Sequence, residues 1–219
     1  MKIVLERPLP HTQTALRDRK IIKILNIGAS SSPGSDPDGG TYQDIIEEEL
    51  ERSIRGLDVQ IIDRGISGEL ARDAAQRLKT EVALTEPDLV LWQVGTNDAL
   101  SQIPVEEFAE TVTEAIHWLK ERNVDVVLVG LHYLRNMRND PHYQAIRAAL
   151  TTIIDGEKIL RIGRYEAMEV IERMKQASSA GRASAFSLTE EGYSCMAEYV
   201  VRAITSAIFL TRADRQPTN

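Results

Sequence analysis

Short apolar runs alternate with longer amphipathic segments along almost the whole chain, and this alternation constrains its fold more than any other feature. Glycine, proline or charged residues bound the apolar runs, which are typical of strands buried on both faces of a parallel sheet. They span residues 21–27, 58–62, 88–94, 124–131 and 158–162. The segments between them carry apolar residues at helical spacing and span residues 41–54, 67–84, 105–122, 143–154, 165–176 and 189–210. This pattern predicts an α/β fold, a three-layer doubly wound sandwich around a five-stranded parallel sheet.

The domain organisation follows from the same pattern. The sequence contains no repeat, low-complexity linker or shift in composition between residues 21 and 210, so we expect one domain there. The first 20 residues are polar and include Pro8 and Pro10, which favours a flexible arm at residues 1–20. We expect residues 211–219 to form a C-terminal tail.

Composition excludes several classes of partner. The net charge is −7, from 26 basic and 33 acidic residues, which disfavours a nucleic acid or an anionic membrane surface. No apolar run approaches the roughly 20 residues of a membrane span, and the N-terminus lacks the apolar centre of a secretory signal. The single Cys195 cannot form an internal disulfide. We therefore expect a cytoplasmic protein.

The candidate site residues follow three of the expected strands. Ligands of doubly wound folds bind at the carboxyl ends of the strands. Gly28-Ala29-Ser30-Ser31-Ser32 follows the first strand, Arg64-Gly65-Ile66-Ser67-Gly68 the second and Gly95-Thr96-Asn97-Asp98 the third. The sequence therefore predicts that Ser30, Gly68 and Asn97 share one cleft.

At these three segments the chain resembles the SGNH, or GDSL, hydrolase family, and the resemblance extends from about residue 21 to residue 210. It implies the flavodoxin-like fold of that family. It also implies that Ser30 occupies the position of the nucleophile. The backbone N–H groups of Ser30 and Gly68 and the side-chain amide of Asn97 would then donate to the oxyanion of an ester under attack.

The chain departs from this family at three polar positions. The family's last motif is Asp-x-x-His, where this chain has Ser184 and Ser187, although the flanking Leu188-Thr189-Glu190-Glu191-Gly192-Tyr193 matches. Ala29 replaces the aspartate of the first motif. A serine hydroxyl needs a base oriented by a carboxylate to become a good nucleophile. The sequence therefore predicts weak or rewired activity.

His132 is the candidate for a substitute base, because it follows the fourth expected strand and lies at the rim of the predicted site. The alternative is that His132 is a hydrogen-bonded residue at a strand end. Asp98 is a possible orienting or metal-binding carboxylate. No His, Cys or Asp cluster has the spacing of a metal site, so we expect no metal and no cofactor.

Three functions stay open on the sequence. The first is an ester hydrolase that acts on a small acyl ester or an acylated carbohydrate. The second is a catalytically inactive binding module that keeps the pocket and the oxyanion donors. The third is acyl transfer to a sugar, which some members of the family perform.

Overall fold

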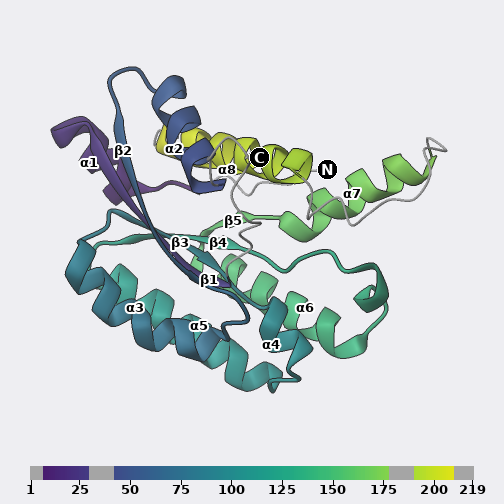
Figure 1. Ribbon diagram of the computed structural model, residues 1–219. Helices are drawn as coiled ribbons and strands as arrows, with labels where there is room; N and C mark the ends of the chain where they lie inside the picture. Colours follow the sequence, from purple (N-terminus) through teal and green to yellow (C-terminus); the bar gives the residue numbers. More distant parts are fainter. Residues whose placement is uncertain (1–6, 30–41, 178–189, 210–219) are drawn as a thin grey trace, which may run out of the picture.

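The computed structural model describes residues 7–29, 42–177 and 190–209, and a five-stranded parallel sheet lies at its centre (Figure 1). The strands are β1 (Ile21–Ala29), β2 (Asp58–Ile66), β3 (Leu89–Gln93), β4 (Asp125–Val129) and β5 (Leu160–Ile162). Their order in the sheet is β2-β1-β3-β4-β5, and all neighbours are parallel. The direction of winding reverses between β1 and β3, which is where the ligand crevice of such a sheet forms. The predicted fold class is confirmed.

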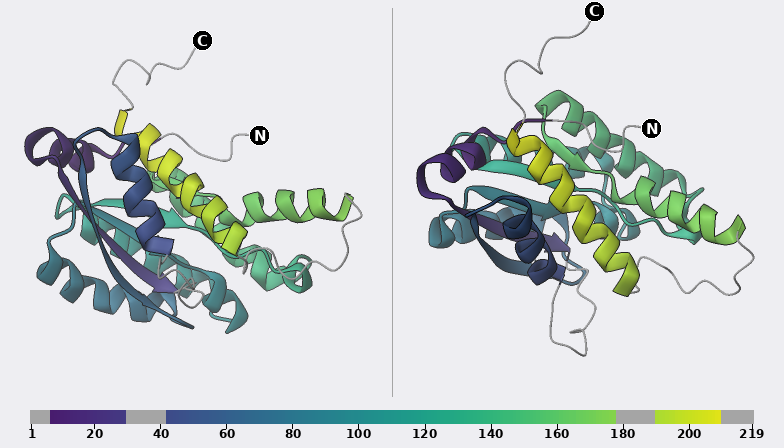
Figure 2. Two further views of the ribbon diagram at one scale, coloured as in Figure 1. Left: turned by 45° about the horizontal axis from the view of Figure 1, so that its top comes forward. Right: turned by 90° about the horizontal axis from the view of Figure 1, so that it is seen from above.

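Helices cover both faces of the sheet (Figures 1 and 2). One layer contains α3 (Ala71–Thr85), α5 (Val105–Lys120) and α6 (Pro141–Glu157). The other contains α1 (Pro10–Arg19), α2 (Tyr42–Ser53) and α8 (Glu190–Phe209), with α7 (Arg164–Ala177) beside them. A short helix, α4 (Thr96–Leu100), follows β3, and a single 3₁₀ turn, η1 (Arg135–Met137), precedes α6.

β3 is continuously apolar from Leu89 to Trp92, and its packing explains why. Val90 and Trp92 join the hydrophobic core beneath α3 and α5, while Leu89 and Leu91 join the core beneath α2 and α8. Successive side chains of a strand point to opposite faces. Because helices cover both faces, both sets of side chains must be apolar.

The helix α1 differs from the flexible arm expected at residues 1–20. Its first turn contains Pro10, and Leu9 and Ala15 are buried against the sheet. Thr12 donates both its backbone N–H and its hydroxyl to Oδ2 of Asp125, each over 2.8 Å. These contacts attach α1 to the domain, so the expected boundary at residue 21 does not hold for residues 7–20. The tail expected at 211–219 lies outside the described residues.

Two element boundaries matter for the site. β2 continues to Ile66, four residues beyond the expected end, because it stays paired with β1 as far as Ala29. α3 begins at Ala71 rather than at residue 67. The residues between these elements form a turn that contains Gly68.

The edge strand β2 has its outer backbone groups covered by carboxylates. The Val59 N–H donates to Oε1 of Glu51 over 3.0 Å, and the Ile61 N–H donates to Oε2 of Glu47 over 3.0 Å. Both glutamates come from α2. Open N–H groups on an edge strand are a template for pairing with another chain. The acidic face of α2 therefore closes part of this edge.

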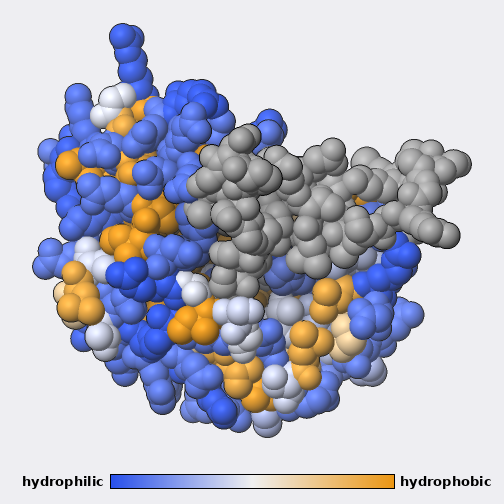
Figure 3. Space-filling view, in the orientation of Figure 1, coloured by the Kyte–Doolittle hydropathy of each residue, from blue (hydrophilic) through white to orange (hydrophobic). Residues whose placement is uncertain are grey.

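Hydrophobic side chains form small clusters among hydrophilic ones on the face of the molecule seen in Figure 3. Large hydrophobic residues that stay exposed include Ile66 and Leu100. Each lies within three residues of a candidate oxyanion donor in the sequence. Among the described helices, none is long and apolar enough to cross a membrane.

Candidate active site

The backbone of Gly28, near the carboxyl end of β1, leaves no room for a side chain against the neighbouring strand β3. Gly28 has a φ of +97°, and a Cβ atom at this position would lie 2.1 Å from the carbonyl oxygen of Gln93. Only glycine fits such a backbone. The first motif therefore needs its glycine so that β1 can approach β3 where the winding reverses. Ala29 is the last described residue of this motif, and Ser30, Ser184 and Ser187 lie outside the described residues.

The second motif forms a tight turn directly after β2. The Glu69 N–H donates to the carbonyl of Ile66 over 3.2 Å, which closes the turn. Gly68 is its third residue and has a φ of +81°, the backbone that favours glycine at this position of a turn. Gly68 is exposed, and no atom of residues 7–29, 42–177 or 190–209 would lie within 4 Å of a Cβ placed on it. The described part of the chain therefore leaves this residue uncovered.

The third motif brings Asn97 to that turn. The Asn97 Nδ2 donates to the carbonyl of Glu69 over 3.0 Å. Gly95 makes this placement possible, because its φ is +102° and a Cβ there would lie 2.7 Å from Cδ1 of Leu131. A side-chain amide has two hydrogens, and the bond to Glu69 uses one of them. The structure thus brings Asn97 to the residue next to Gly68. The shared cleft with Ser30 and the role of these groups as oxyanion donors stay predictions.

The buried carboxylate of Asp98 binds the backbone at the start of α3. Its side chain is 2% exposed, and Oδ1 accepts the N–H of Ala71 over 2.9 Å, which caps the start of α3. Burial raises the pKa of Asp98. Among the described residues, no group of three or more His, Cys, Asp and Glu could hold a metal ion. These contacts favour the helix cap over the orienting or metal-binding role.

His132 is held by its backbone. Its N–H donates to Oγ1 of Thr96 over 3.0 Å, and its carbonyl accepts the hydroxyl of Tyr143 over 2.7 Å. Burial, and secondarily the positive charge of Arg164, lower the pKa of His132 to about 3. An efficient general base has a pKa near the working pH. This environment opposes the protonated imidazole and favours the alternative, a hydrogen-bonded residue at a strand end.

A buried arginine crosses the carboxyl ends of the central strands. Arg164 follows β5, is 4% exposed, and donates from Nη1 to Oε1 of Gln93 over 3.1 Å. Gln93 is the last residue of β3. Neither residue can be predicted as a site residue from the sequence, because one charged and one amide side chain at two strand ends give no motif. Their contact places a fixed positive charge beneath this edge of the sheet.

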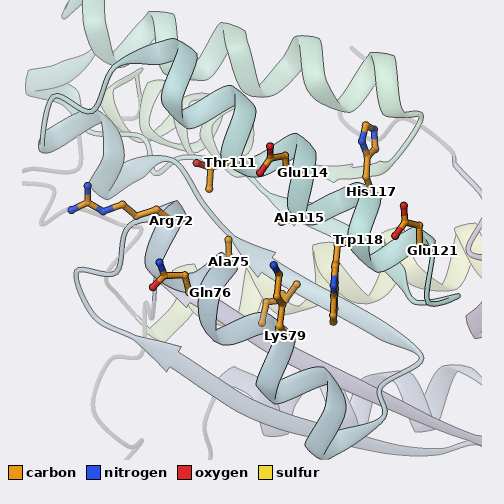
Figure 4. Close-up of a pocket in the computed structure, with 11 residues that line it drawn as sticks. Arg72, Ala75, Gln76, Lys79, Thr111, Glu114, Ala115, His117, Trp118 and Glu121 are labelled. Carbon is orange, nitrogen blue, oxygen red and sulfur yellow. The ribbon is translucent and has the colours of Figure 1, made fainter.

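A groove of about 500 Å³ lies elsewhere, between α3 and α5 (Figure 4). Its lining includes Lys79 of α3 and Trp118 of α5, which extend toward each other in the close-up. None of its lining residues belongs to the three motifs. The groove is therefore separate from the candidate active site.

Comparison with known proteins gives a family and a fold. The model of the non-GDSL lipase-like family matches residues 2–209. An arylesterase of Vibrio mimicus is 29% identical over 110 residues, which are 50% of this chain and 54% of the arylesterase. The match thus spans about half the length of that relative.

Two solved structures show the likeness of fold. A lipase/acylhydrolase from Enterococcus faecalis has a TM-score of 0.67 at 23% identity, over 84% of this chain and 95% of that chain. An acetylxylan esterase from Geobacillus stearothermophilus has a TM-score of 0.61 at 19% identity, over 87% and 95%. With the family match, this fold confirms the resemblance to the SGNH/GDSL hydrolases.

Proposed function

The chain belongs to the non-GDSL lipase-like family, and we propose that it is a weak ester hydrolase of a small acyl ester or an acetylated sugar. In this proposal the Ser30 Oγ attacks the acyl carbon, the ester C–O bond breaks, and the serine proton leaves on the alcohol. Water then cleaves the acyl-serine, which releases the acid and restores the hydroxyl. The Gly68 N–H and the Asn97 amide would stabilise the oxyanion of each step.

The observation that carries this proposal is the hydrogen bond from Asn97 to Glu69. It fixes the Asn97 amide beside the Gly68 turn, at 3.0 Å from the carbonyl of the adjacent residue. Gly68 is exposed, and none of the residues that the structure describes covers it. Two candidate donors from different motifs therefore lie at the end of the sheet where β1 ends, which supports the proposal. The arylesterase and the acetylxylan esterase to which the chain is similar support an ester as the substrate.

The degenerate last motif supports weak activity. Ser184 and Ser187 stand where an aspartate and a histidine would supply the base. The environment of His132 opposes its use as a replacement. Enzymes of this kind that lose their base keep about 10³–10⁴-fold catalysis over water from the oxyanion hole and binding. We expect activity of that order.

The alternative is a catalytically inactive binding module that retains the pocket and the oxyanion donors. The lowered pKa of His132 also favours this binding module. At about 3, it leaves the described part of the site without a suitable histidine base. Such a module would bind an acyl ester or its product through the same two donors. Steady-state hydrolysis of 4-nitrophenyl acetate separates the two functions. Turnover above background that disappears in Ser30→Ala supports the hydrolase, and turnover unchanged in Ser30→Ala rejects it.

A repair variant tests why the activity is weak. Ser187→His with Ser184→Asp restores the family's acid–base pair at its own spacing. Positioned general base catalysis contributes about 10²–10⁴-fold. The double variant should gain rate, and Ser187→His alone should gain less because its imidazole lacks an orienting carboxylate. A folded double variant with no gain would contradict the idea that only the base is missing.

A further inference from the structure

The turn that presents Gly68 has little to hold it from within. One backbone hydrogen bond, from Glu69 to Ile66 over 3.2 Å, closes it. Ser67 and Gly68 are both exposed. Glycine has more backbone freedom than any other residue, so an exposed turn built on it needs external support. If Gly68 serves as a donor, something outside the turn must fix it.

Arg77 of α3 supplies contacts on both sides of the turn. Its Nε donates to Oε1 of Glu69 over 2.7 Å and its Nη2 to Oε2 of Glu69 over 3.0 Å. The same Nη2 donates to the carbonyl of Arg64, within β2, over 2.7 Å. One planar guanidinium therefore joins the residues before and after Gly68. Lysine could not make this forked contact, because its ammonium is a single point charge.

Glu69 is the residue where these contacts meet. Its carboxylate is bound to Arg77, and its carbonyl accepts the amide of Asn97. The Glu69 side chain is only 4% exposed, whereas the Arg77 side chain is 29% exposed. A buried carboxylate that loses its cation must find water or a new partner. Loss of Arg77 would therefore move Glu69, and with it both the Gly68 turn and the partner of Asn97.

We propose that Arg77 is a positioning residue that, through Glu69, holds the Gly68 turn and the Asn97 amide in one fixed geometry. This inference rests on the proposed function for its catalytic consequence, although the fixed geometry itself is independent of turnover. Arg77 acts through Glu69 rather than on the substrate. Its removal should therefore lower kcat and leave KM nearly unchanged, because donors that lose alignment weaken transition-state binding most.

The test compares Arg77→Met and Arg77→Lys with Arg72→Met as the matched control. Arg72 lies on the same helix, and its ion pairs with Asp73 and Glu107 do not involve the turn. The first measurement is the ¹⁵N order parameter of the Gly68 amide and the Asn97 side chain. We expect order parameters of about 0.85 in the parent and in Arg72→Met. In Arg77→Met the order parameter of the Gly68 amide should fall below about 0.6. Arg77→Lys should lie between them.

The second measurement is the steady-state rate on 4-nitrophenyl acetate. Arg77→Met should lower kcat by about tenfold or more with KM within about twofold, and Arg72→Met should change neither. If Arg77→Met does not fold, Glu69→Gln replaces it, because glutamine keeps the shape and loses the charge that Arg77 binds. A Gly68 amide as rigid in these variants as in the parent would overturn the inference. If the parent shows no turnover, the order parameters alone decide it, and only the proposed function fails.

Discussion

The Asn97 Nδ2 lies 3.0 Å from the carbonyl oxygen of Glu69, so residues 28 positions apart in the sequence share one hydrogen bond at the candidate active site. Asn97→Asp keeps the shape of the side chain but replaces this donor with a carboxylate. Loss of one oxyanion donor typically lowers kcat by about 10²–10³-fold. We expect a loss of that size in steady-state ester hydrolysis. Asn136→Asp, at an exposed position, is the matched control and should keep the parent rate.

An Asn97→Asp variant that folds and keeps the parent kcat would contradict the oxyanion role. The Asn97 amide would then serve only to hold the turn. A loss of kcat together with an equal loss in Asn136→Asp would indicate a general effect of added charge.

Asp98 gives a prediction for stability against pH. Burial raises its pKa above the ordinary value of 3.8. The folded protein therefore binds this proton more tightly than the unfolded chain does, and stability falls as pH rises from 3.8 through the raised pKa. Asp98→Asn keeps an acceptor for the Ala71 N–H. It has no titrating carboxyl at this position, so it should not show this fall in stability with rising pH. We expect the stability of Asp98→Asn relative to the parent to rise with pH across this window and then level off.

Urea unfolding from pH 3.5 to pH 8 measures this difference. Asp155→Asn, an exposed substitution on α6, controls for the change in net charge. A stability difference between Asp98→Asn and the parent that stays constant with pH would show that Asp98 has the same pKa in both states.

The strands and the helix-covered sheet could be predicted because a strand buried on both faces needs a run of consecutive apolar residues, which is visible in the sequence. Val90 and Leu91 point to opposite cores, so β3 is apolar at every position from Leu89 to Trp92. The glycines of the site also leave a trace: Gly28 and Gly95 occupy backbones that other residues would strain. Gly28 is the penultimate residue of β1, and Gly95 lies two residues after β3, so both lie near the carboxyl end of a strand, where the sequence predicts the site.

Long-range polar contacts account for what the sequence did not reveal. The helix α1 has a polar sequence, and its attachment depends on Thr12 reaching Asp125, 113 residues away. In the sequence, Arg77 has the spacing of an ordinary solvent-facing residue of a helix. Only the structure shows that it binds the Glu69 carboxylate. The helix α4 has five residues, too few for helical periodicity to appear. Spacing alone cannot identify such pairs.

His132 should remain neutral across the physiological range. Its pKa of about 3 means that its imidazole resonances should not titrate between pH 5 and pH 8 in an NMR experiment. His132→Gln should then cost less than about tenfold in kcat, whereas removal of a general base costs about 10²–10⁴-fold. A titration near pH 6.5, with a loss of more than 10²-fold in His132→Gln, would restore the substitute-base hypothesis.

The glutamates of α2 should protect the edge of the sheet. Glu47 and Glu51 accept two outward N–H groups of β2. Glu47→Ala with Glu51→Ala should leave these groups open, so that β2 can pair with β2 of a second copy. We expect sedimentation velocity to show self-association that increases with concentration. Glu48→Ala is the control, because Glu48 pairs with Arg52 on the exposed side of α2. A double variant that sediments as the parent does at every concentration would rule out this protective role.

In the proposed function, Ser30 is a nucleophile served by the Gly68 and Asn97 donors. The most direct measurement is intact-mass and peptide-mass analysis after incubation with a fluorophosphonate. We expect slow, stoichiometric phosphonylation of the peptide that contains Ser30. We also expect no labelling in Ser30→Ala and parent-like labelling in Ser101→Ala, an exposed control. A protein that stays unlabelled, or that is labelled equally after Ser30→Ala, would contradict the role of Ser30 as a nucleophile.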